Sequence, residues 1–460
     1  MTSVAATTVD LAVIGSGGAA MAAAIHARQR GATVVLVEQA TLGGTCVNIG
    51  CVPSKTLLAA AGLRHSALTN PFLGVATSAG AVDFGALVEQ KDELVARLRQ
   101  HKYADVASGY GFEVRVGHAR FRDADTLLVN GEALLARAYL IATGAQPTVP
   151  ELPGLSEVEF LTSTTAMELP ELPQSLVVIG GGYVGVEQAQ LFAHLGISVT
   201  MVGRLAPRAE PELASRLHKV FAEDGITVVT DRAACIEPNG AGAVVVTETG
   251  QRLAAQRLLV AVGRAPRTAG MNLPASGIKT DDHGFVVVDA EQRTSNPRVF
   301  AAGDVSGAPQ FVYVAAAAGK VAATNALGGS DRLDYTGLPA VIFTRPQLAC
   351  AGLTEAVALQ QGHRCQCRLL DLADLPRALV SRDTRGAIKL VADADTGQVL
   401  GVHALADGAG EMMLAATYAI KAGFTVDDLA DTWAPYLTMA EGLRLVAGLF
   451  RNQMPTSCCA

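Results

Sequence analysis

The chain lacks the features that would tie it to nucleic acid, a membrane or the cell exterior. It has no block of lysine and arginine and a net charge of −7, so it offers no electrostatic footprint for nucleic acid or anionic lipid. Its longest apolar stretches, 11–25 and 258–262, fall short of the roughly 20 residues of a membrane span. Residues 1–10 have neither the basic region nor the apolar core of a secretion signal. We therefore expect a cytoplasmic protein with small-molecule partners, no nucleic acid and no membrane.

Cysteine is scarce too. Eight cysteines in 460 residues are too few for the disulfide framework of a secreted domain. Half of the residues are hydrophobic, 17% are charged and 47 are glycine, which indicates a folded chain with many tight turns and excludes disorder. At roughly 150 residues per domain, the length predicts about three domains.

The stretch 9–38 has the pattern strand, glycine turn, helix, strand. Its turn contains Gly15, Gly17 and Ala20, and its second strand ends in Glu38. In a dinucleotide fold the first glycine makes the tight turn, the second lets a pyrophosphate approach the backbone, and the small third residue packs helix on strand. The acidic strand end accepts ribose hydroxyls. The stretch therefore predicts a site for a dinucleotide with free hydroxyls, such as FAD.

The same pattern recurs at 175–202. Its glycines are Gly180, Gly182 and Gly185. At the strand end this copy has Gly203 and Arg204 where the first copy has Glu38. A carboxylate would repel a 2′-phosphate, whereas an arginine accommodates one, so the second site favours NADPH over NADH. The alternative is that Arg204 is an ordinary solvated surface residue.

Cys46 and Cys51 lie between Glu38 and the next predicted helix. A zinc site usually needs a second Cys/His pair at matching spacing, and none follows. A structural disulfide is not expected in a reducing cytosol. A redox pair beside a flavin is the remaining interpretation. Because Pro53 is a favoured first helical residue, we expect the helix N-terminus to lower the pKa of Cys51.

Five short motifs in one order resemble the class I FAD-dependent pyridine nucleotide disulfide oxidoreductases. They are 43–46, 51–55, 142–144, 262–264 and 301–304. The resemblance implies an α/β fold with two Rossmann-like dinucleotide-binding domains and a C-terminal α+β dimerisation domain. The implied divisions are an FAD-binding domain at 1–150, an NADPH-binding domain at 151–270, a return segment completing the central domain at 271–337, and the dimerisation domain with its Cys-Cys tail at 338–460.

The resemblance also assigns cofactor positions. FAD would contact Gly15, Gly17, Ala20, Glu38, Ala40, Gly44, Thr45, Lys55, Ala119, Thr143, Gly144, Asp304 and Val312. NADPH would contact Gly180, Gly182, Tyr183, Gly185, Arg204 and Gly263. Lys55 would lie near the flavin N5 with Glu187 as its ion-pair partner. Tyr183 would cover the nicotinamide pocket, and Asp304 would hydrogen-bond the ribityl chain.

The chain ends with Cys458 and Cys459, and adjacent cysteines at a terminus are rarely packing residues. They are either a relay dithiol for a protein disulfide or a soft ligand for a thiophilic metal ion. Disulfide-reducing family members carry a His-Pro-Thr segment whose histidine protonates the leaving thiolate. Here 436–441 begins Tyr-Leu-Thr, and no histidine follows His403. Tyrosine, with a pKa near ~10, is a poor acid for that step.

The tail and the Tyr-Leu-Thr segment resemble the mercuric reductases within this family. The resemblance implies NADPH-dependent reduction of Hg(II) to Hg(0) in a homodimer, with each active site shared between subunits. Hg(II) would arrive as a thiol complex, be taken up by Cys458 and Cys459 of the partner subunit, and pass to Cys46 and Cys51. The implied catalytic residues are Cys46, Cys51, Tyr436, Lys55, Glu187 and Glu441. The alternative is a thioredoxin-reductase-like enzyme in which the tail relays electrons.

Two further expectations concern what the chain contains besides this site. No additional N-terminal metal-binding domain is expected, because the first strand begins near Val9. The remaining cysteines are expected to pack as small hydrophobes. They are Cys235, Cys350, Cys365 and Cys367. Cys365 and Cys367 could face one side of a strand, which would make a second metal site the less favoured alternative.

Overall fold

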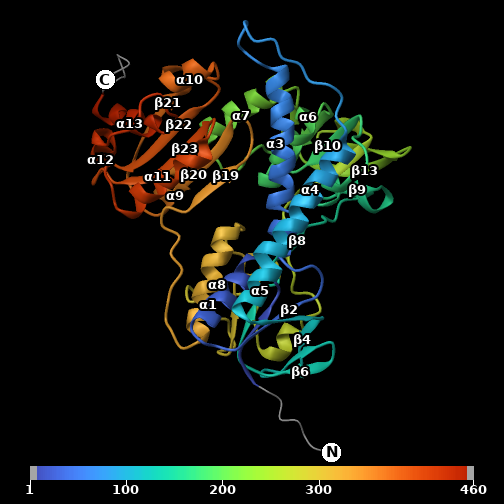
Figure 1. Cartoon of the computed structure of the whole chain (residues 1–460). Helices are drawn as coiled ribbons and strands as arrows, with labels where there is room; N and C mark the ends of the chain where they lie inside the picture. Colours follow the sequence, from blue (N-terminus) through green and yellow to red (C-terminus); the bar gives the residue numbers. More distant parts are fainter. Residues whose placement is uncertain (1–7, 453–460) are drawn as a thin grey trace, which may run out of the picture. The chain divides into compact units, whose positions relative to one another are not determined.

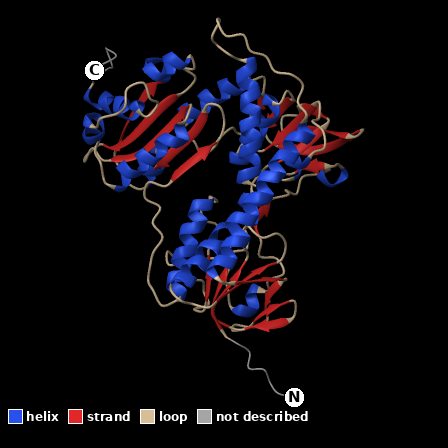
Figure 2. Cartoon of the chain, viewed as in Figure 1, coloured by secondary structure: helices blue, strands red, loops and turns tan. Residues whose placement is uncertain are grey.

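The structure is a computed structural model of the chain and describes residues 8–452. Its contacts divide it into two compact units. The first unit comprises the residues up to 56, 85–148 and 263–334, and the second comprises 57–84, 149–262 and the residues from 335 onward. Figure 1 follows the chain through both units, and Figure 2 marks their helices and strands.

The first unit is built on a parallel sheet in the order β18-β7-β1-β2-β3. Its strands are β1 (Val9–Ile14), β2 (Val34–Glu38), β3 (Glu113–Val116), β7 (Ala136–Ile141) and β18 (Val299–Ala301). The central strands are nearly continuous runs of buried apolar residues because both faces of the sheet are covered. One face carries α1 (Gly18–Gln29) and α8 (Val312–Ala326). These two helices touch through small residues, and a side chain at Gly319 would clash with the carbonyl oxygen of Ala19.

Shorter elements surround this sheet. An antiparallel sheet on its other face contains β4 (Ala119–Phe121), β5 (Leu127–Val129) and β6 (Glu132–Leu134). A two-stranded ribbon pairs β8 (Ala145–Pro147) with β17 (Arg264–Pro266). The helices of this unit are α2 (Gly44–Asn48), α4 (Phe84–Arg99) from residue 85 onward, the π-helix η1 (Gln100–Ala104) and α5 (Asp105–Tyr110). The helix α3 (Cys51–Leu68) begins in the first unit, and its residues from 57 onward belong to the second.

The second unit repeats the parallel pattern in the order β12-β11-β10-β16-β9. Its strands are β9 (Phe160–Leu161), β10 (Ser175–Ile179), β11 (Ser198–Val202), β12 (Thr227–Val229) and β16 (Arg257–Val260), with helices α6 (Tyr183–His194) and α7 (Pro211–Glu223). A shared apolar core joins this sheet to an antiparallel one. The antiparallel strands are β13 (Ala233–Asn239), β14 (Gly242–Thr247) and β15 (Arg252–Ala255).

The same unit also contains a five-stranded antiparallel sheet in the order β19-β20-β23-β22-β21. Its strands are β19 (Pro339–Ile342), β20 (Gln347–Gly352), β21 (Cys365–Asp371), β22 (Ala387–Asp393) and β23 (Val399–Ala406). An apolar core on one face holds α11 (Ala409–Lys421), α12 (Val426–Asp431) and α13 (Glu441–Gly448). The shorter α9 (Glu355–Gln360) and α10 (Pro376–Ser381) complete this region.

Three sequence expectations need correction. The C-terminal strands predicted from the sequence, 340–344, 387–392 and 399–404, correspond to β19, β22 and β23, and the prediction missed β20 and β21. The cysteine segment was expected to precede a helix, yet Cys46 lies in α2 and α3 begins at Cys51 itself. By length and composition alone, the stretch Gly44–Leu68 could cross a membrane, with a mean hydropathy of 1.3 and 33% of it buried, although no such stretch was expected. One such helix is weak support for a span, because core helices pass the same test.

Candidate functional site

The first glycine turn is shaped to receive a phosphate-bearing group. Gly15 has a φ of 107°, and a side chain there would clash with the carbonyl oxygen of Ala142. A Cβ on Gly44 would lie 2.6 Å from the Cα of Gly17. Two stretches of backbone therefore approach each other without side chains beside the N-terminus of α1, as close backbone binding of a pyrophosphate requires.

The acidic strand end is held by its neighbours. Ser16 donates a hydrogen bond from its hydroxyl to Oε2 of Glu38 at 2.5 Å, and the Ala40 N–H donates to Oε1 at 2.8 Å. Gly43 N–H donates to the Ser16 hydroxyl at 2.9 Å, which ties the strand end to the start of α2. The Glu38 carboxylate is thus fixed beside the glycine turn.

The Thr143 hydroxyl is buried, and no hydrogen-bond partner for it exists among residues 8–452. It lies two residues after the end of β7 and precedes Gly144, whose φ is 71°. A buried hydroxyl without a partner costs stability unless a further group satisfies it. Together with the glycine turn and the fixed Glu38, this orphaned donor shows that the residues present fit FAD.

The other predicted FAD positions are distributed over the same unit. Ala20 is fully buried in α1, Ala119 begins β4, and Val312 begins α8 with 39% of its surface exposed. Asp304 lies 3.7 Å from Arg264, and burial raises the pKa of Asp304. Which of these residues contact a cofactor stays a prediction.

The two cysteines of the first unit are brought together. Cys46 is half-buried in α2, Cys51 is exposed at the start of α3, and both are in the thiol form. A hydrogen bond with Cys51 and then burial raise the pKa of Cys46, while Lys55, one turn along α3, acts in the opposite direction. Cys51 presents its sulfur at a helix N-terminus.

Sequence reasoning missed two residues beside these thiols. Burial and then the two cysteines raise the pKa of Tyr103 to about 12, so its hydroxyl stays protonated close to both sulfurs. Arg264 is half-buried, and its charge interacts with Asp304 and Cys51. Tyr103 lies on the π-helix η1, and π-bulges often occur at functional sites. No local pattern in the sequence indicates that Tyr103 or Arg264 lies beside the two cysteines.

The second glycine turn has the same construction. Gly180 has a φ of 113°, and a side chain there would clash with the Ala261 carbonyl oxygen. A side chain on Gly185 would clash with the carbonyl oxygen of Gly180. Gly182 caps the N-terminus of α6, which points a positive helix end at this turn. The arrangement fits a second dinucleotide.

Tyr183 and Arg204, two of the residues predicted to contact NADPH, lie in the same unit as this turn. Tyr183 is the first residue of α6, and burial raises its pKa to about 12. Arg204 is exposed, and its guanidinium donates to the Pro207 carbonyl at 3.3 Å. Arg208, which sequence reasoning did not single out, is exposed and interacts electrostatically with Tyr183. Gly263 belongs to the first unit, with a φ of 134°.

Glu187 is buried in α6 and accepts a hydrogen bond from the Phe343 N–H at 3.0 Å. Because Lys55 belongs to the first unit and Glu187 to the second, their pairing stays a prediction.

Glu441 is buried at the start of α13, and its Oε2 has no hydrogen-bond partner in the described part of the chain. Tyr436 is 51% exposed. Cys458 and Cys459 lie outside the described residues.

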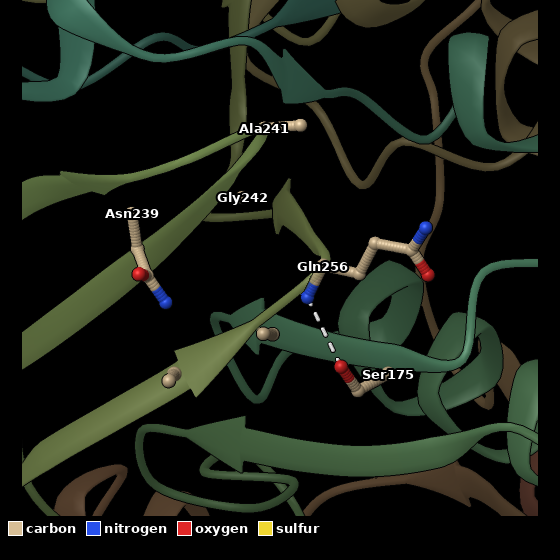
Figure 3. A pocket seen from close by; sticks show the side chains of 7 residues that line it. Ser175, Asn239, Ala241, Gly242 and Gln256 are labelled. Carbon is tan, nitrogen blue, oxygen red and sulfur yellow. Dashed lines mark hydrogen bonds between the residues drawn. The ribbon is translucent and has the colours of Figure 1, made fainter.

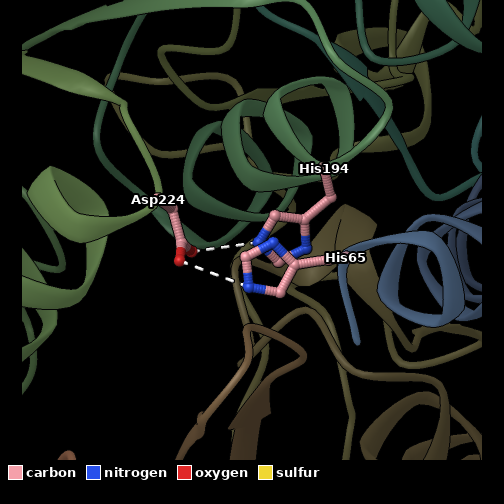
Figure 4. Close-up of side chains that lie close together, drawn as sticks. All are labelled: His65, His194 and Asp224. Carbon is pink, nitrogen blue, oxygen red and sulfur yellow. Dashed lines mark hydrogen bonds and ion pairs between the residues drawn. The ribbon is translucent and has the colours of Figure 1, made fainter. Parts of the chain in front are cut away.

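A separate cluster joins His65, His194 and Asp224 (Figure 4). The imidazole rings stack 3.8 Å apart, and their Nε2 atoms lie 3.5 and 3.0 Å from the two oxygens of Asp224. Parallel rings do not aim two lone pairs at one ion, and Arg385 lies 3.7 Å from the same carboxylate. The cluster is a hydrogen-bonded structural group.

A pocket of about 370 Å³ opens beside β10, β14 and β15 (Figure 3). Its lining residues are Ser175, Asn239, Ala241, Gly242, Ala254, Ala255 and Gln256. The Gln256 N–H donates to the Ser175 hydroxyl across it at 3.0 Å. It contains none of the predicted site residues.

Comparison with known proteins identifies the family. Residues 9–319 match the pyridine nucleotide-disulphide oxidoreductase family, and residues 338–447 match its dimerisation domain. The chain belongs to the pyridine nucleotide-disulphide oxidoreductases. Membership confirms the predicted fold class and the prediction that the protein is an oxidoreductase. It also implies that the protein uses a flavin and a nicotinamide nucleotide. The match to the dimerisation domain indicates a homodimer. The boundaries predicted for the four functional domains stay a prediction.

The similar curated members of this family include mercuric reductases. The chain is 52% identical to the Streptomyces lividans mercuric reductase, with 98% of each chain covered. It is 46% identical to the Staphylococcus aureus mercuric reductase, covering 98% of this chain and 84% of that one. These relatives confirm the resemblance to the mercuric reductases.

Solved structures agree on the fold. The HOCl-induced flavoprotein disulfide reductase RclA from Escherichia coli superimposes with a TM-score of 0.86 at 31% identity, covering 96% of this chain and 99% of that one. LpdA from Mycobacterium tuberculosis has a TM-score of 0.86 at 28% identity, covering 96% and 100%.

Proposed function

We propose that this oxidoreductase reduces Hg(II) to Hg(0) with NADPH in the cytoplasm. The observation that carries the proposal is the 52% identity to a mercuric reductase over 98% of both chains. The structure contributes a pair of adjacent thiols in the unit whose glycine turn, Glu38 and Thr143 fit FAD. Thiolates are the soft ligands that a thiophilic cation prefers.

The proposed reaction consumes one NADPH and one Hg(II) bound by two small thiolates. With one proton it yields NADP⁺, Hg(0) and two thiols, so two electrons and all protons balance. FAD, when bound, would accept hydride from NADPH and supply its two electrons to the sulfur pair. Arg204 is proposed to bind the 2′-phosphate that distinguishes NADPH, and the exposed Arg208 stands close enough in sequence to assist it.

Each residue of the thiol pair has its own task. Cys51, exposed at the N-terminus of α3, is the sulfur that an incoming Hg(II) reaches first. Cys46 is half-buried and hydrogen-bonded with Cys51, so it becomes a second ligand when its proton leaves. Tyr103 keeps its own proton beside them and can stabilise developing thiolate charge by donating a hydrogen bond.

The segment around Tyr436 fits a reaction that needs no general acid. Reducing a disulfide expels a thiolate that must be protonated, whereas metallic mercury leaves without a proton. No histidine follows His403 in the sequence, and Tyr436 stands where the disulfide-reducing members have theirs. We propose that Tyr436 and the buried Glu441 line the path by which Hg(II) reaches the inner thiols.

Delivery of the substrate is proposed to involve a second subunit. Cys458 and Cys459 of the partner subunit would take Hg(II) from its thiol complex and pass it to Cys46 and Cys51 by ligand exchange. The match to a dimerisation domain at 338–447 supports a homodimer in which such sharing can occur.

The test compares substrates and then removes the tail. NADPH oxidation should proceed with Hg(II) in excess small thiol and not with oxidised thioredoxin, glutathione or lipoamide. The double variant Cys458→Ala/Cys459→Ala should lose most Hg(II) turnover in excess thiol while keeping activity with an artificial electron acceptor. Rapid thioredoxin reduction, with Hg(II) bound but not reduced, would overturn the proposal in favour of a thioredoxin-reductase-like relay.

A further inference from the structure

Two cysteines that the proposed reaction does not use lie side by side on the edge strand of the C-terminal sheet. Cys365 and Cys367 belong to β21, and both are half-buried while the intervening Gln366 is exposed. Because side chains alternate along a strand, the two thiols face the same side of the sheet. The pairing register places Cys365 opposite Asp393 and Cys367 opposite Val391 on β22.

This side of the sheet is polar. The other side carries Leu370, Ile388 and Leu390 into the apolar core. On the thiol side, the ammonium of Lys389 lies 2.8, 2.9 and 2.8 Å from carboxylate oxygens that belong to Glu210, Glu212 and Glu355. The three carboxylates outnumber the single ammonium. Asp393 lies opposite Cys365 and has its Oδ2 2.8 Å from Nδ1 of His363, so the three carboxylates around Lys389 dominate the local charge and attract cations.

Strand geometry decides what can bridge these thiols. Residues i and i+2 are about 6.6 Å apart along a strand, so their parallel Cβ atoms lie beyond the roughly 3.5–4.5 Å that a disulfide requires. A metal ion bound linearly by two thiolates at about 2.3 Å each spans about 4.6 Å between the sulfurs. Each sulfur then needs to lean inwards by only about 1 Å. The spacing suits a metal bridge better than a disulfide.

We propose that Cys365 and Cys367 form a second binding site for a thiophilic cation of the Hg(II) class. The cation is taken from a complex with two small thiols by ligand exchange. Two sulfur–mercury bonds to the small thiols break and two form to the cysteines. The cysteine protons pass to the released thiols, and no electron moves. The site is independent of the proposed reduction, because it needs neither NADPH nor the inner cysteines.

The surroundings also explain why these thiols stay available. Burial and then Glu355, which accepts a hydrogen bond from Cys367, raise the pKa of Cys367 to about 12. Burial and the nearby carboxylates raise the pKa of Cys365 as well. Protonated thiols react slowly with oxidants and with other disulfides. A cation that displaces both protons gains two soft ligands in a region of net negative charge.

The experiment counts mercury on the oxidised holoenzyme without NADPH. The tail variant Cys458→Ala/Cys459→Ala is incubated with Hg(II) as its cysteine complex and then filtered against excess cysteine. We expect one Hg(II) retained per chain. Adding Cys365→Ser or Cys367→Ser should abolish retention, because a single thiol lacks the chelate advantage over a free competitor. The control Cys235→Ser, a lone half-buried cysteine on β13, should keep it.

Alkylation followed by mass spectrometry gives a second readout on the unmutated positions. Hg(II) should protect Cys365 and Cys367 together, and Cys235 should stay reactive. No retained Hg(II) in the tail variant, or equal retention with and without the two serine substitutions, would overturn the proposal. Each of these results is independent of whether the holoenzyme reduces Hg(II) when NADPH is added.

Discussion

Lys389 provides the clearest test of how charge is arranged in the second unit. It is 2% exposed in the middle of an apolar strand, and its ammonium contacts three carboxylates at 2.8, 2.9 and 2.8 Å. Burial opposes the charge, but the hydrogen bonds with Glu210, Glu355 and Glu212 outweigh it and raise the pKa of Lys389. Of these partners, Glu210 is also buried, at 3% exposure, whereas Glu212 is 43% exposed.

Lys389→Met should therefore destabilise the protein strongly. It fills the same volume but leaves the buried carboxylate of Glu210 without its cation, and removing one partner of a buried pair typically costs about 3–5 kcal/mol. Glu212→Gln removes a carboxylate that water already reaches, and should cost no more than about 1 kcal/mol. The double variant Lys389→Met/Glu210→Gln should recover part of the loss because no buried charge is left unpaired.

The assay is urea denaturation of the FAD-loaded protein followed by circular dichroism, at one protein concentration because a dimer's stability depends on it. The expected order of midpoints is wild type, Glu212→Gln, the double variant and then Lys389→Met. The reasoning would be refuted if the free energy of unfolding of Lys389→Met were within about 1 kcal/mol of the wild-type value. It would also be refuted if Glu212→Gln lost as much unfolding free energy as Lys389→Met.

Three further outcomes are expected. Gly15→Ala should lower the FAD content and reduce the free energy of unfolding by at least about 2 kcal/mol. The control Gly31→Ala should bind FAD normally, because Gly31 has a φ of 81° but no described atom lies within 4 Å of its Cβ. Equal FAD content in both variants would contradict the role given to the first glycine turn. Arg204→Glu should shift the ratio of the specificity constants for NADPH and NADH tenfold or more towards NADH, since each charge-assisted contact to the 2′-phosphate contributes roughly 1.5–3 kcal/mol. An unchanged ratio would mean that other residues recognise the phosphate. Burial and then His194 lower the pKa of His65 to about 4, so between pH 6.5 and 4 the unfolded chain binds a proton at this residue that the folded chain does not. The free energy of unfolding should therefore fall by at most about 3 kcal/mol as the pH is lowered through this range. His65→Gln should reduce this pH dependence in denaturation experiments at several pH values.

The nucleotide turns were predictable because their signals are local. The stretch 9–38 begins with β1 and ends with β2, and the stretch 175–202 begins with β10 and ends with β11, as predicted. A tight turn, a close backbone approach and a helix start each require particular residues at fixed spacing. All of them fall within one short stretch of sequence.

The missed strands depend on distant residues. β21 mixes cysteine, glutamine and arginine with leucine, so its alternation is weak, and Cys367 on it hydrogen-bonds Glu355, which belongs to the separate helix α9. Lys389 interrupts an apolar run for the same reason. The carboxylates that compensate it lie as far as 179 residues away in sequence, where no local pattern reveals them.

The thiol site was predicted in part. Adjacent motif residues identified Cys46, Cys51 and Lys55, but Tyr103 is brought to them by a π-helix on another segment. Tertiary packing, and not sequence spacing, sets that contact. The roles of all these residues stay predictions.

The central claim is that electrons from NADPH end on mercury. The direct measurement collects Hg(0) vapour while NADPH oxidation is recorded, with Hg(II) supplied in excess small thiol. The account predicts one Hg(0) per NADPH for the wild type and none for Cys46→Ala/Cys51→Ala, which should still transfer electrons to an artificial acceptor. NADPH oxidation without Hg(0), or full Hg(0) production by the double variant, would contradict it.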